Sequence, residues 1–434
     1  MSYQFSKFGQ HLAAGSGIGE LMDDLGNALA SASPSLKMLG GGQPAHIPAI
    51  HAVWQQRVAE ILAETGGLER SLTCYDPPRG NPLFLNAIAK LFRDSFGWDI
   101  GPQNVAVTSG GQSAFFFLFN LLAGEMPDGH HRRILLPLVP EYIGYANQGI
   151  NGGLFHAVPP LIEVSGPHDF KYRVNFDQLH ITPNIAAICA SRPTNPTGNV
   201  LTDEEISQLS ALAKHHGIPL ILDNAYGTPF PNILFTSARP FWEPHVILTL
   251  SLSKLGLPGT RTGIVIGPPE IIRALSSMTA IAGLSNPNIG QQITLPLIES
   301  GRILELSRDL IRPFYQEKCA RARQAAADAF GEDIDWFMHR SEGALFLWLW
   351  FPGLTITSQE LYERLKQREV LIIPGHHFFF GLDDTTPWPH RHQCIRVSYA
   401  MDEEIVREGL EIIAQEVRKS TARSAPSLKG SKHD

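Results

Sequence analysis

Residues 250–263 read LSLSKLGLPGTRTG and continue an apolar run that begins at Val246. A lysine that directly follows a buried strand is unusual, because a long cation is rarely placed there without a partner. Lys254 is therefore open to two interpretations. It is either a lysine of a surface loop, or an amine desolvated enough to be nucleophilic and to form an imine with an aldehyde cofactor.

Hydroxyls, glycines and an arginine surround Lys254. Ser251 and Ser253 precede it by three and one positions, and Arg261 follows it by seven. Hydroxyl groups and a guanidinium are groups that bind a phosphate, and the glycines between them allow the backbone to come close to it. The stretch therefore favours the second interpretation, with a cofactor phosphate held beside the amine.

A second segment places a carboxylate at the end of a strand. Asp223 ends the apolar run PLILD at 219–223, and Tyr226 follows three residues later. In a doubly wound sheet, ligands bind outside the carboxyl ends of the strands. A carboxylate there can keep a pyridine nitrogen protonated, which makes the ring an electron sink, and Tyr226 could bond to a ring hydroxyl. The alternative for Asp223 is the N-cap of a helix.

Two further segments carry chemistry in loops. SRPTNPTG at 191–198 surrounds Asn195 with prolines and a glycine, which make a rigid turn that fixes one amide side chain. TSGGQS at 108–113, with Gly111 and Gln112, stands before a helical pattern. Glycines before a helix N-terminus make an anion site from free N–H groups and the helix dipole, so this segment is predicted to bind the phosphate.

The pattern around these segments predicts an α/β fold. From Val105 to about Gly267, apolar strand-like runs alternate with helical patterns, which indicates a mostly parallel sheet between helices. The expected strands are 104–109, 133–138, 185–190, 219–223, 246–253 and 262–267, and the expected helices are 48–65, 80–96, 112–122 and 202–216.

After Pro296 the pattern changes to a smaller α+β domain. A long helix is expected over 303–330, with a break or kink at Pro313. The other expected elements there are 344–351, 358–369, 370–374, 394–400 and 402–419. We predict an N-terminal segment at 1–45 that packs with the small domain, a large cofactor domain at 46–300, a small domain at 301–419 and a disordered tail at 420–434.

In this order and spacing, the motifs resemble the class I and II aminotransferases of pyridoxal 5′-phosphate (PLP) fold type I. The motifs are NPTG at 195–198, Asp223 with Tyr226, and SLSK at 251–254 with Arg261. Other stretches resemble the valine–pyruvate subgroup of that family, and these are MLGGGQPAHIP (38–48), QSAFFFLFNL (112–121), PEYIGYA (140–146), SRPTNPTGNV (191–200), LSLSKLGLPG (250–259), EGALFLWLWF (342–351) and PWPHRHQC (387–394).

The resemblance implies a role for each residue of a PLP site. Lys254 would hold PLP as a Schiff base and move the substrate proton, while Asp223 would pair with the pyridine nitrogen. The ring oxygen would contact Asn195 and Tyr226, and Tyr142 would stack on the ring. The residues implied to bind the phosphate are Gly111, Gln112, Ser251, Ser253 and Arg261.

The resemblance also implies how substrates and a second subunit are bound. Arg396 would bind the substrate carboxylate, with backbone N–H groups from Gly41 and Gly42. Tyr75 would reach the phosphate in the partner subunit, which implies a homodimer. The implied reaction is transamination between an L-amino acid and a 2-oxo acid, with L-valine and pyruvate giving 3-methyl-2-oxobutanoate and L-alanine.

The sequence leaves rival functions open. A β-lyase or an aminotransferase with another substrate would share every cofactor residue. A PLP-sensing regulator is the rival that is not an enzyme, but it predicts a basic helix-turn-helix segment, and no basic cluster precedes residue 38. The apolar walls that would select the substrate side chain are not identifiable from the sequence.

The composition of the chain limits which partners, location and metal sites can be expected. A net charge of −7 disfavours nucleic acid as the main partner. The scattered residues Cys74, Cys189, Cys319 and Cys394 suit reduced thiols. We expect a cytoplasmic protein without signal peptide or membrane span. No metal site is expected, because neither a carboxylate nor a cysteine stands at ligand spacing from the paired loop histidines, which are His376, His377, His390 and His392.

Overall fold

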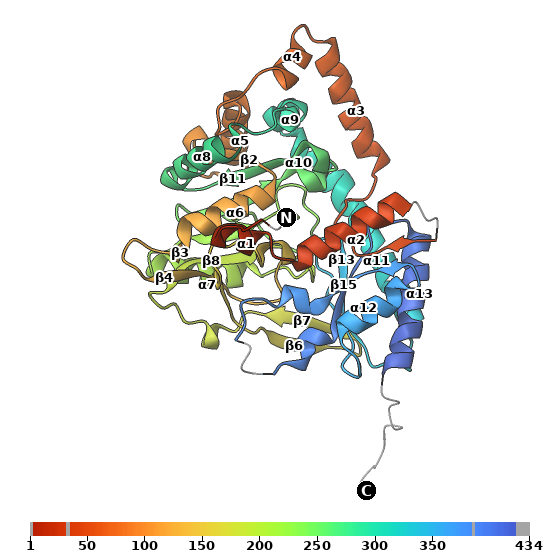
Figure 1. The fold of residues 1–434 in the computed structure, drawn as a ribbon. Coiled ribbons are helices and arrows are strands. Elements are labelled where there is room, and N and C mark those ends of the chain that lie inside the picture. The colour runs from red at the N-terminus through yellow and green to blue at the C-terminus, as the bar shows by residue number, and fades with distance from the viewer. Residues whose placement is uncertain (1–2, 32–34, 384–386, 422–434) are drawn as a thin grey trace.

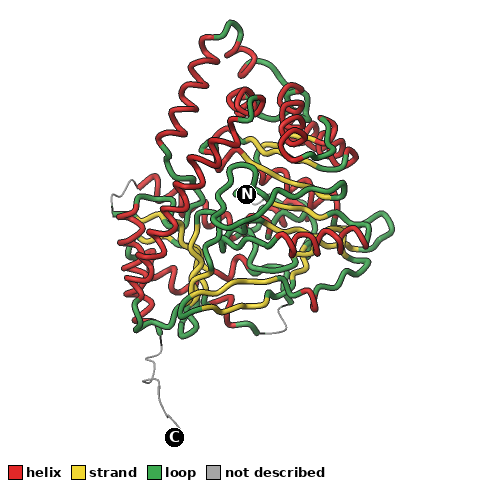
Figure 2. Tube along the Cα trace, turned by 180° about the vertical axis from the view of Figure 1, so that it is seen from behind, coloured by secondary structure: helices red, strands yellow, loops and turns green. Residues whose placement is uncertain are grey.

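The computed structural model describes residues 3–31, 35–383 and 387–421. Two sheets organise the chain, and helices lie on the outside of the strands (Figures 1 and 2). No helix in the described part of the chain is both long and apolar enough to pass through a bilayer. All four cysteines are free, and Cys74 alone among the four is exposed.

The larger sheet has eight strands in the order β2-β11-β10-β9-β8-β4-β3, with β5 also paired to β4. Strands β4, β5, β8, β9 and β10 are parallel, whereas β11 and β3 run against their neighbours. The prediction of a mostly parallel sheet is therefore confirmed. The bounds are β2 Val105–Ser109, β3 Gly124–Glu125, β4 His131–Leu136, β5 Phe155–Ala157, β8 Ile185–Ser191, β9 Leu220–Asp223, β10 Val246–Ser251 and β11 Thr262–Ile266.

Strands β8, β9 and β10 are buried on both faces, which explains why their sequences are apolar throughout. The helix between β8 and β9 begins at a capping box, in which Thr202 and Glu205 satisfy each other's backbone N–H groups. The helices of this part of the chain are α3 Pro48–Ala63, α4 Gly67–Leu72, α5 Pro82–Phe96, α6 Gly111–Leu122, α7 Asp203–His215, α8 Pro269–Gly283 and α9 Ile289–Glu299.

The second sheet has six strands in the order β15-β16-β13-β12-β7-β6. Two of them, β6 (Leu161–Ser165) and β7 (Asp169–Arg173), lie within the predicted large domain 46–300, yet β7 pairs in parallel with β12 (Phe337–His339). The predicted boundary at residue 300 would divide this sheet, so we propose that the second domain also includes residues 161–173. The other strands are β13 Phe346–Trp350, β15 Ile373–Pro374 and β16 Cys394–Ser398.

The C-terminal helices show where the expected break falls. A π-helical segment, Ser307–Ile311, separates α10 (Arg302–Leu306) from α11 (Arg312–Phe330), and Pro313 stands in the first turn of α11, so the expected break is confirmed. Helix α12 spans Ser358–Lys366 and α13 spans Glu403–Ser420.

The tail begins later than residue 420. Ser420 is the last residue of α13, and Thr421 forms an isolated bridge with Leu354. The carbonyl of Ser420 also accepts hydrogen bonds from the backbone and hydroxyl of Thr355, so this end of the helix is held in place. The rest of the predicted tail, 422–434, lies outside the described residues.

The N-terminal segment lies against the second domain. It contains α1 (Lys7–Leu12), α2 (Gly17–Ser31) and β1 (Lys37–Met38), and β1 pairs in parallel with β14 (Val370–Leu371). The carboxylate of Asp24 on α2 accepts hydrogen bonds from Tyr362 and Lys366 of α12. These contacts hold α2 on the second domain.

Candidate active site

The carboxyl ends of β8, β9 and β10 meet at one edge of the larger sheet, because the three strands are parallel neighbours. A cavity of about 300 Å³ lies there. Every residue that we predicted for the site lines this cavity except Tyr75. They are Gly41, Gly42, Gly111, Gln112, Tyr142, Asn195, Asp223, Tyr226, Ser251, Ser253, Lys254, Arg261 and Arg396.

Lys254 faces the cavity from a short 3-10 turn, Leu252–Leu255, that directly follows β10. Its Nζ donates to the carbonyl of Gly42 and lies 5.2 Å from the centroid of the Tyr226 ring. Burial, together with the positive charges of Arg396 and Arg261, lowers the pKa of Lys254 to about 8. Lys254 is therefore not a lysine of a surface loop, because it faces the cavity and its Nζ is bonded to a backbone carbonyl, and its lowered pKa leaves part of the amine neutral near neutral pH.

Asp223 is buried at the end of β9, where its carboxylate reaches the cavity. The hydroxyl of Tyr145 donates to Oδ2, and the backbone N–H of Ala225 donates to Oδ1 at 2.9 Å. Burial raises the pKa of Asp223 above its ordinary value. The helix N-cap interpretation is wrong, because residues 224–245 contain no helix. The carboxylate is placed to receive a cationic N–H from the cavity.

The other end of the cavity has the features of a phosphate site. Gly110 has φ of +85°, and a Cβ built there would lie 2.1 Å from Nη2 of Arg261. A side chain at this position would thus occupy the space of the guanidinium. Helix α6 begins at the next residue, and the hydroxyls of Ser251 and Ser253 lie 3.0 Å apart on the same cavity. The donors and the free helix N-terminus fit a phosphate.

Arg396 enters the cavity from β16 and is only 2% exposed. Its Nη1 donates to the side-chain oxygen of Asn195 at 2.6 Å, and its Nη2 donates to the carbonyl of Gly40 at 2.6 Å. Its Nε has no hydrogen-bond partner among the residues that the structure describes. Burial lowers the pKa of Arg396 to about 10. A buried cation bonded to neutral oxygens is suited to an anionic ligand.

Comparison with known proteins assigns the family. The model of the family "Aminotransferase class I and II" matches residues 50–413. The chain is also 47% identical to the valine–pyruvate aminotransferase of Escherichia coli K12, over 97% of this chain and 99% of that protein.

This chain belongs to the class I and II aminotransferases.

Solved structures agree with that assignment. The valine–pyruvate aminotransferase of Salmonella typhimurium LT2 superposes on the aminotransferase described here with a TM-score of 0.85 and 46% identity, covering 93% of this chain and 98% of that chain. The aspartate aminotransferase of Thermus thermophilus with maleate is 22% identical with a TM-score of 0.75, over 96% and 100% of the two chains, and shows the fold alone. The predicted fold class, PLP-dependent transferase fold type I, is confirmed.

One predicted site residue lies away from the cavity of this aminotransferase. Tyr75 is 82% exposed and follows α4 in the chain. Helices α3 and α4 form the top of the molecule in Figure 1. The hydroxyl of Tyr75 therefore takes no part in the site of its own chain. The predicted role in a partner subunit remains a proposal.

The structure adds cavity residues that the sequence analysis missed. Ile18, Leu21 and Met22 of α2 form an apolar part of the wall. Phe115 lines the cavity and is also core, as expected for the aromatic run 115–119, and Ile143 lies beside Tyr142. An amphipathic pattern in 17–31 was the available signal, but it does not say which surface the apolar face covers.

The histidines lie elsewhere. His390 is buried in the second domain, where its Nε2 lies 2.6 Å from the hydroxyl of Tyr172 and 3.7 Å from the sulfur of Cys394. The rings of His376 and His377 are in contact at 4.0 Å, and His376 also stacks on His392 at 5.8 Å. Within the described residues, no group of three or more His, Cys, Asp or Glu side chains could hold a metal ion.

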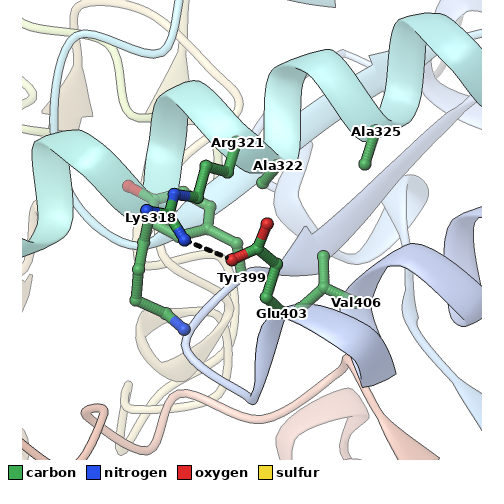
Figure 3. Close-up of a pocket in the computed structure, with 7 residues that line it drawn as sticks. All are labelled: Lys318, Arg321, Ala322, Ala325, Tyr399, Glu403 and Val406. Carbon is green, nitrogen blue, oxygen red and sulfur yellow. Dashed lines mark hydrogen bonds and ion pairs between the residues drawn. The ribbon is translucent and has the colours of Figure 1, made fainter.

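A second hollow lies between α11 and α13 (Figure 3). It measures about 20 Å³, which is room for little more than a water molecule. Arg321 donates to Glu403 across it at 2.6 Å, and none of the predicted site residues lines it. The cavity around Lys254 is the candidate active site.

Proposed function

We propose that this aminotransferase uses PLP to transfer the amino group of L-valine to pyruvate, which yields 3-methyl-2-oxobutanoate and L-alanine. One observation carries the cofactor part of the proposal. A single cavity is lined by Lys254, an amine of lowered pKa, by Asp223, a buried carboxylate, and by a phosphate cradle of Gly111 and Arg261, against which Gly110 packs. The relative from Escherichia coli supports the choice of valine and pyruvate.

Each end of PLP has a matching group. Lys254 would hold the aldehyde carbon, Asp223 would receive the N–H of the ring, and the start of α6 with Arg261 would receive the phosphate. Tyr226 and Asn195 stand on the same cavity for the ring oxygen. When bound, PLP supplies a protonated ring that takes up negative charge from the α-carbon of the substrate.

The residues around PLP orient the amino acid and move its proton. The planar guanidinium of Arg396 binds the α-carboxylate, which every amino acid and 2-oxo acid substrate has in common. This contact fixes the Cα–H bond in the direction of Lys254. The neutral amine of Lys254 would then take the proton from Cα and hold it on Nζ until it is returned. Tyr145 keeps Asp223 in place through its hydrogen bond.

The apolar walls of the cavity suit a substrate with an aliphatic side chain. Ile18, Leu21 and Met22 face the cavity from α2, and Phe115 and Ile143 face it from the large domain. Burying each methyl or methylene group against such a surface is worth about 0.8 kcal/mol. Among the described residues that line this cavity, the only Lys or Arg besides Lys254 and Arg396 is Arg261, which belongs to the phosphate end. The lining thus favours valine over an acidic donor.

We also propose a homodimer in which Tyr75 reaches the phosphate of the partner subunit. Helices α3 and α4 carry exposed apolar side chains, namely Val58, Leu62, Leu68 and Leu72, beside the exposed Tyr75. Apolar groups gathered on one projecting element are typical of an interface. The cytoplasm, which the free cysteines favour, is the proposed location.

A screen of amino donors with pyruvate tests the reaction. Purified protein with PLP is incubated with each L-amino acid, and the alanine formed is quantified. Valine is expected to be among the best donors and aspartate among the poorest. A β-lyase would instead release ammonia from a β-substituted amino acid when no 2-oxo acid has been added as an acceptor. Equal rates for aspartate and valine would contradict the valine assignment.

A further inference from the structure

Glu141, which precedes the cavity residue Tyr142, is a buried carboxylate outside the machinery described above. Its side chain is 3% exposed. Three groups donate to it. The backbone N–H of Tyr142 and the hydroxyl of Ser191 reach Oε1 at 2.8 and 2.6 Å, and the backbone N–H of Ser191 reaches Oε2 at 3.0 Å. None of these donors is a cation.

Ser191 connects Glu141 to Asp223. Ser191 is the last residue of β8, and it is the register partner of Asp223, the last residue of β9. The N–H of Arg192 also donates to the carbonyl of Asp223 at 2.8 Å. Glu141 therefore binds the end of the strand that lies directly beside the carboxylate proposed to hold the cofactor nitrogen.

The two carboxylates belong to one buried group of acids. The charge of Asp223 acts on Glu141, and both charges act on Cys189 and Tyr145. Burial raises the pKa of Glu141 to about 8, and it also raises the pKa of the other three groups. Three cations that line the cavity act electrostatically on this region. The charge of Lys254 acts on the pKa of Asp223, and the charges of Arg261 and Arg396 act on the pKa of Tyr142.

The hydrogen bonds suit both protonation states of Glu141. The hydroxyl of Ser191 donates a hydrogen bond to the ionised carboxylate, and it can turn to accept a hydrogen bond from the O–H of the neutral acid. Two carboxylates in a low-dielectric site repel each other when both are ionised. A cation beside Asp223, such as a protonated ring nitrogen, relieves that repulsion.

We propose that Glu141 is a positioning residue for the amino transfer: it binds the end of β8 against β9 through Ser191, and its charge sets how firmly Asp223 holds a proton on the nitrogen of the bound cofactor. This inference rests on the proposed function. Above pH 8 Glu141 is ionised and strengthens the negative field at Asp223, and below pH 8 it is neutral and weakens it. The nitrogen proton should therefore respond to a group that does not touch the cofactor.

Nitrogen NMR of the holoenzyme with PLP labelled with 15N in the ring tests the proposal. The nitrogen resonance is followed from pH 6 to pH 10 in the natural protein and in three variants. The natural protein should show an inflection in the alkaline range. Glu141→Gln should lose it. Ser191→Ala should keep it but move it to higher pH, because the ionised carboxylate loses one donor. Glu163→Gln, on the exposed strand β6, should match the natural protein.

Kinetics separate positioning from a purely structural role. Glu141→Gln should lower kcat by roughly tenfold and leave KM for pyruvate within about twofold, since Arg396 is untouched. An unchanged inflection in Glu141→Gln overturns the proposal. If that variant does not fold, an unmoved inflection in Ser191→Ala overturns it. The proposal is also overturned if the natural protein binds PLP but its nitrogen resonance shows no inflection between pH 6 and pH 10. Failure of PLP to bind would instead overturn the proposed function.

Discussion

The guanidinium of Arg396 donates to the side-chain oxygen of Asn195 at 2.6 Å, and this bond joins the second domain to the loop after β8. The two residues are 201 positions apart, yet both line the cavity. The Nε of Arg396 remains unpaired within the described residues while its two Nη groups are engaged. The bond thus holds the guanidinium in one orientation toward an incoming carboxylate.

Arg396→Lys should not be a mild change, because an ammonium cannot form two parallel hydrogen bonds to a carboxylate. We expect kcat/KM for valine, alanine and pyruvate to fall together by roughly two to four orders of magnitude. Both half-reactions are measured spectrally. Arg407→Lys, on the exposed face of α13, serves as the control. Loss confined to one substrate would remove Arg396 from the shared carboxylate site.

Lys254→Ala should abolish the covalent attachment of PLP. Borohydride reduction followed by mass spectrometry should find the adduct on Lys254 in the natural protein and no adduct in the variant. Turnover should be nearly lost, because the same amine moves the proton. Lys214→Ala, an exposed change on α7, should retain both properties. An adduct on a different lysine in the natural protein would refute the assignment.

The lowered pKa of Lys254 predicts how PLP association depends on pH. The neutral amine is the form that attacks, and its share rises with pH until it predominates above about pH 8. The association rate of PLP with apoprotein should therefore rise by roughly tenfold per pH unit below about pH 8 and then level off. Stopped-flow absorbance measures it. Arg396→Gln should move the midpoint upward, since the charge of Arg396 lowers this pKa. A midpoint near 10.5, the ordinary value for lysine, would contradict the burial argument.

Gly110→Ala should weaken PLP binding, because the new Cβ would lie 2.1 Å from Nη2 of Arg261. Gly217→Ala is a matched control, since Gly217 also has positive φ, at +65°, but has nothing within 4 Å of its Cβ position. Gly217→Ala should lose about 1 kcal/mol of stability from backbone strain, and Gly110→Ala should lose more, because φ of +85° with ψ of 167° is adopted essentially by glycine alone. Only Gly110→Ala should raise the Kd for PLP, measured by fluorescence titration. Equal Kd values in the two variants would remove Gly110 from the cradle.

The sequence is informative where chemistry restricts the choice of residue. Lys254 at the end of one apolar strand and Asp223 at the end of another are costly to bury, so their positions in the sequence alone indicate a site. Lys254 and Asp223 lie together because parallel strands end at one edge of the sheet. Arg396, which the family resemblance assigned to the site, reaches the same cavity from a strand of the other sheet.

Other features depend on long-range packing that no local pattern specifies. The apolar residues Leu21 and Met22 resemble those of any amphipathic helix, and their place on the cavity follows from where α2 packs. Strand β7 has an ordinary strand sequence, and its pairing with β12 joins segments about 170 residues apart. Tyr145 lies 78 residues from Asp223, so its hydrogen bond was not predictable from spacing.

The attachment of α2 to α12 through Asp24 has a geometric consequence. Leu21 on α2 and Arg396 on β16 both belong to the part of the molecule built around the six-stranded sheet, whereas Lys254 belongs to the other part. The spacing between Arg396 and the part of the apolar wall that α2 contributes is therefore set within one domain, whereas Phe115 and Ile143 belong to the other. If the domains rotate, a bound amino acid keeps its contacts with Arg396 and α2 while its α-carbon moves relative to the reacting amine. In this fold, the residues that select the length of the substrate can therefore differ from the residue that must align with its α-carbon for reaction.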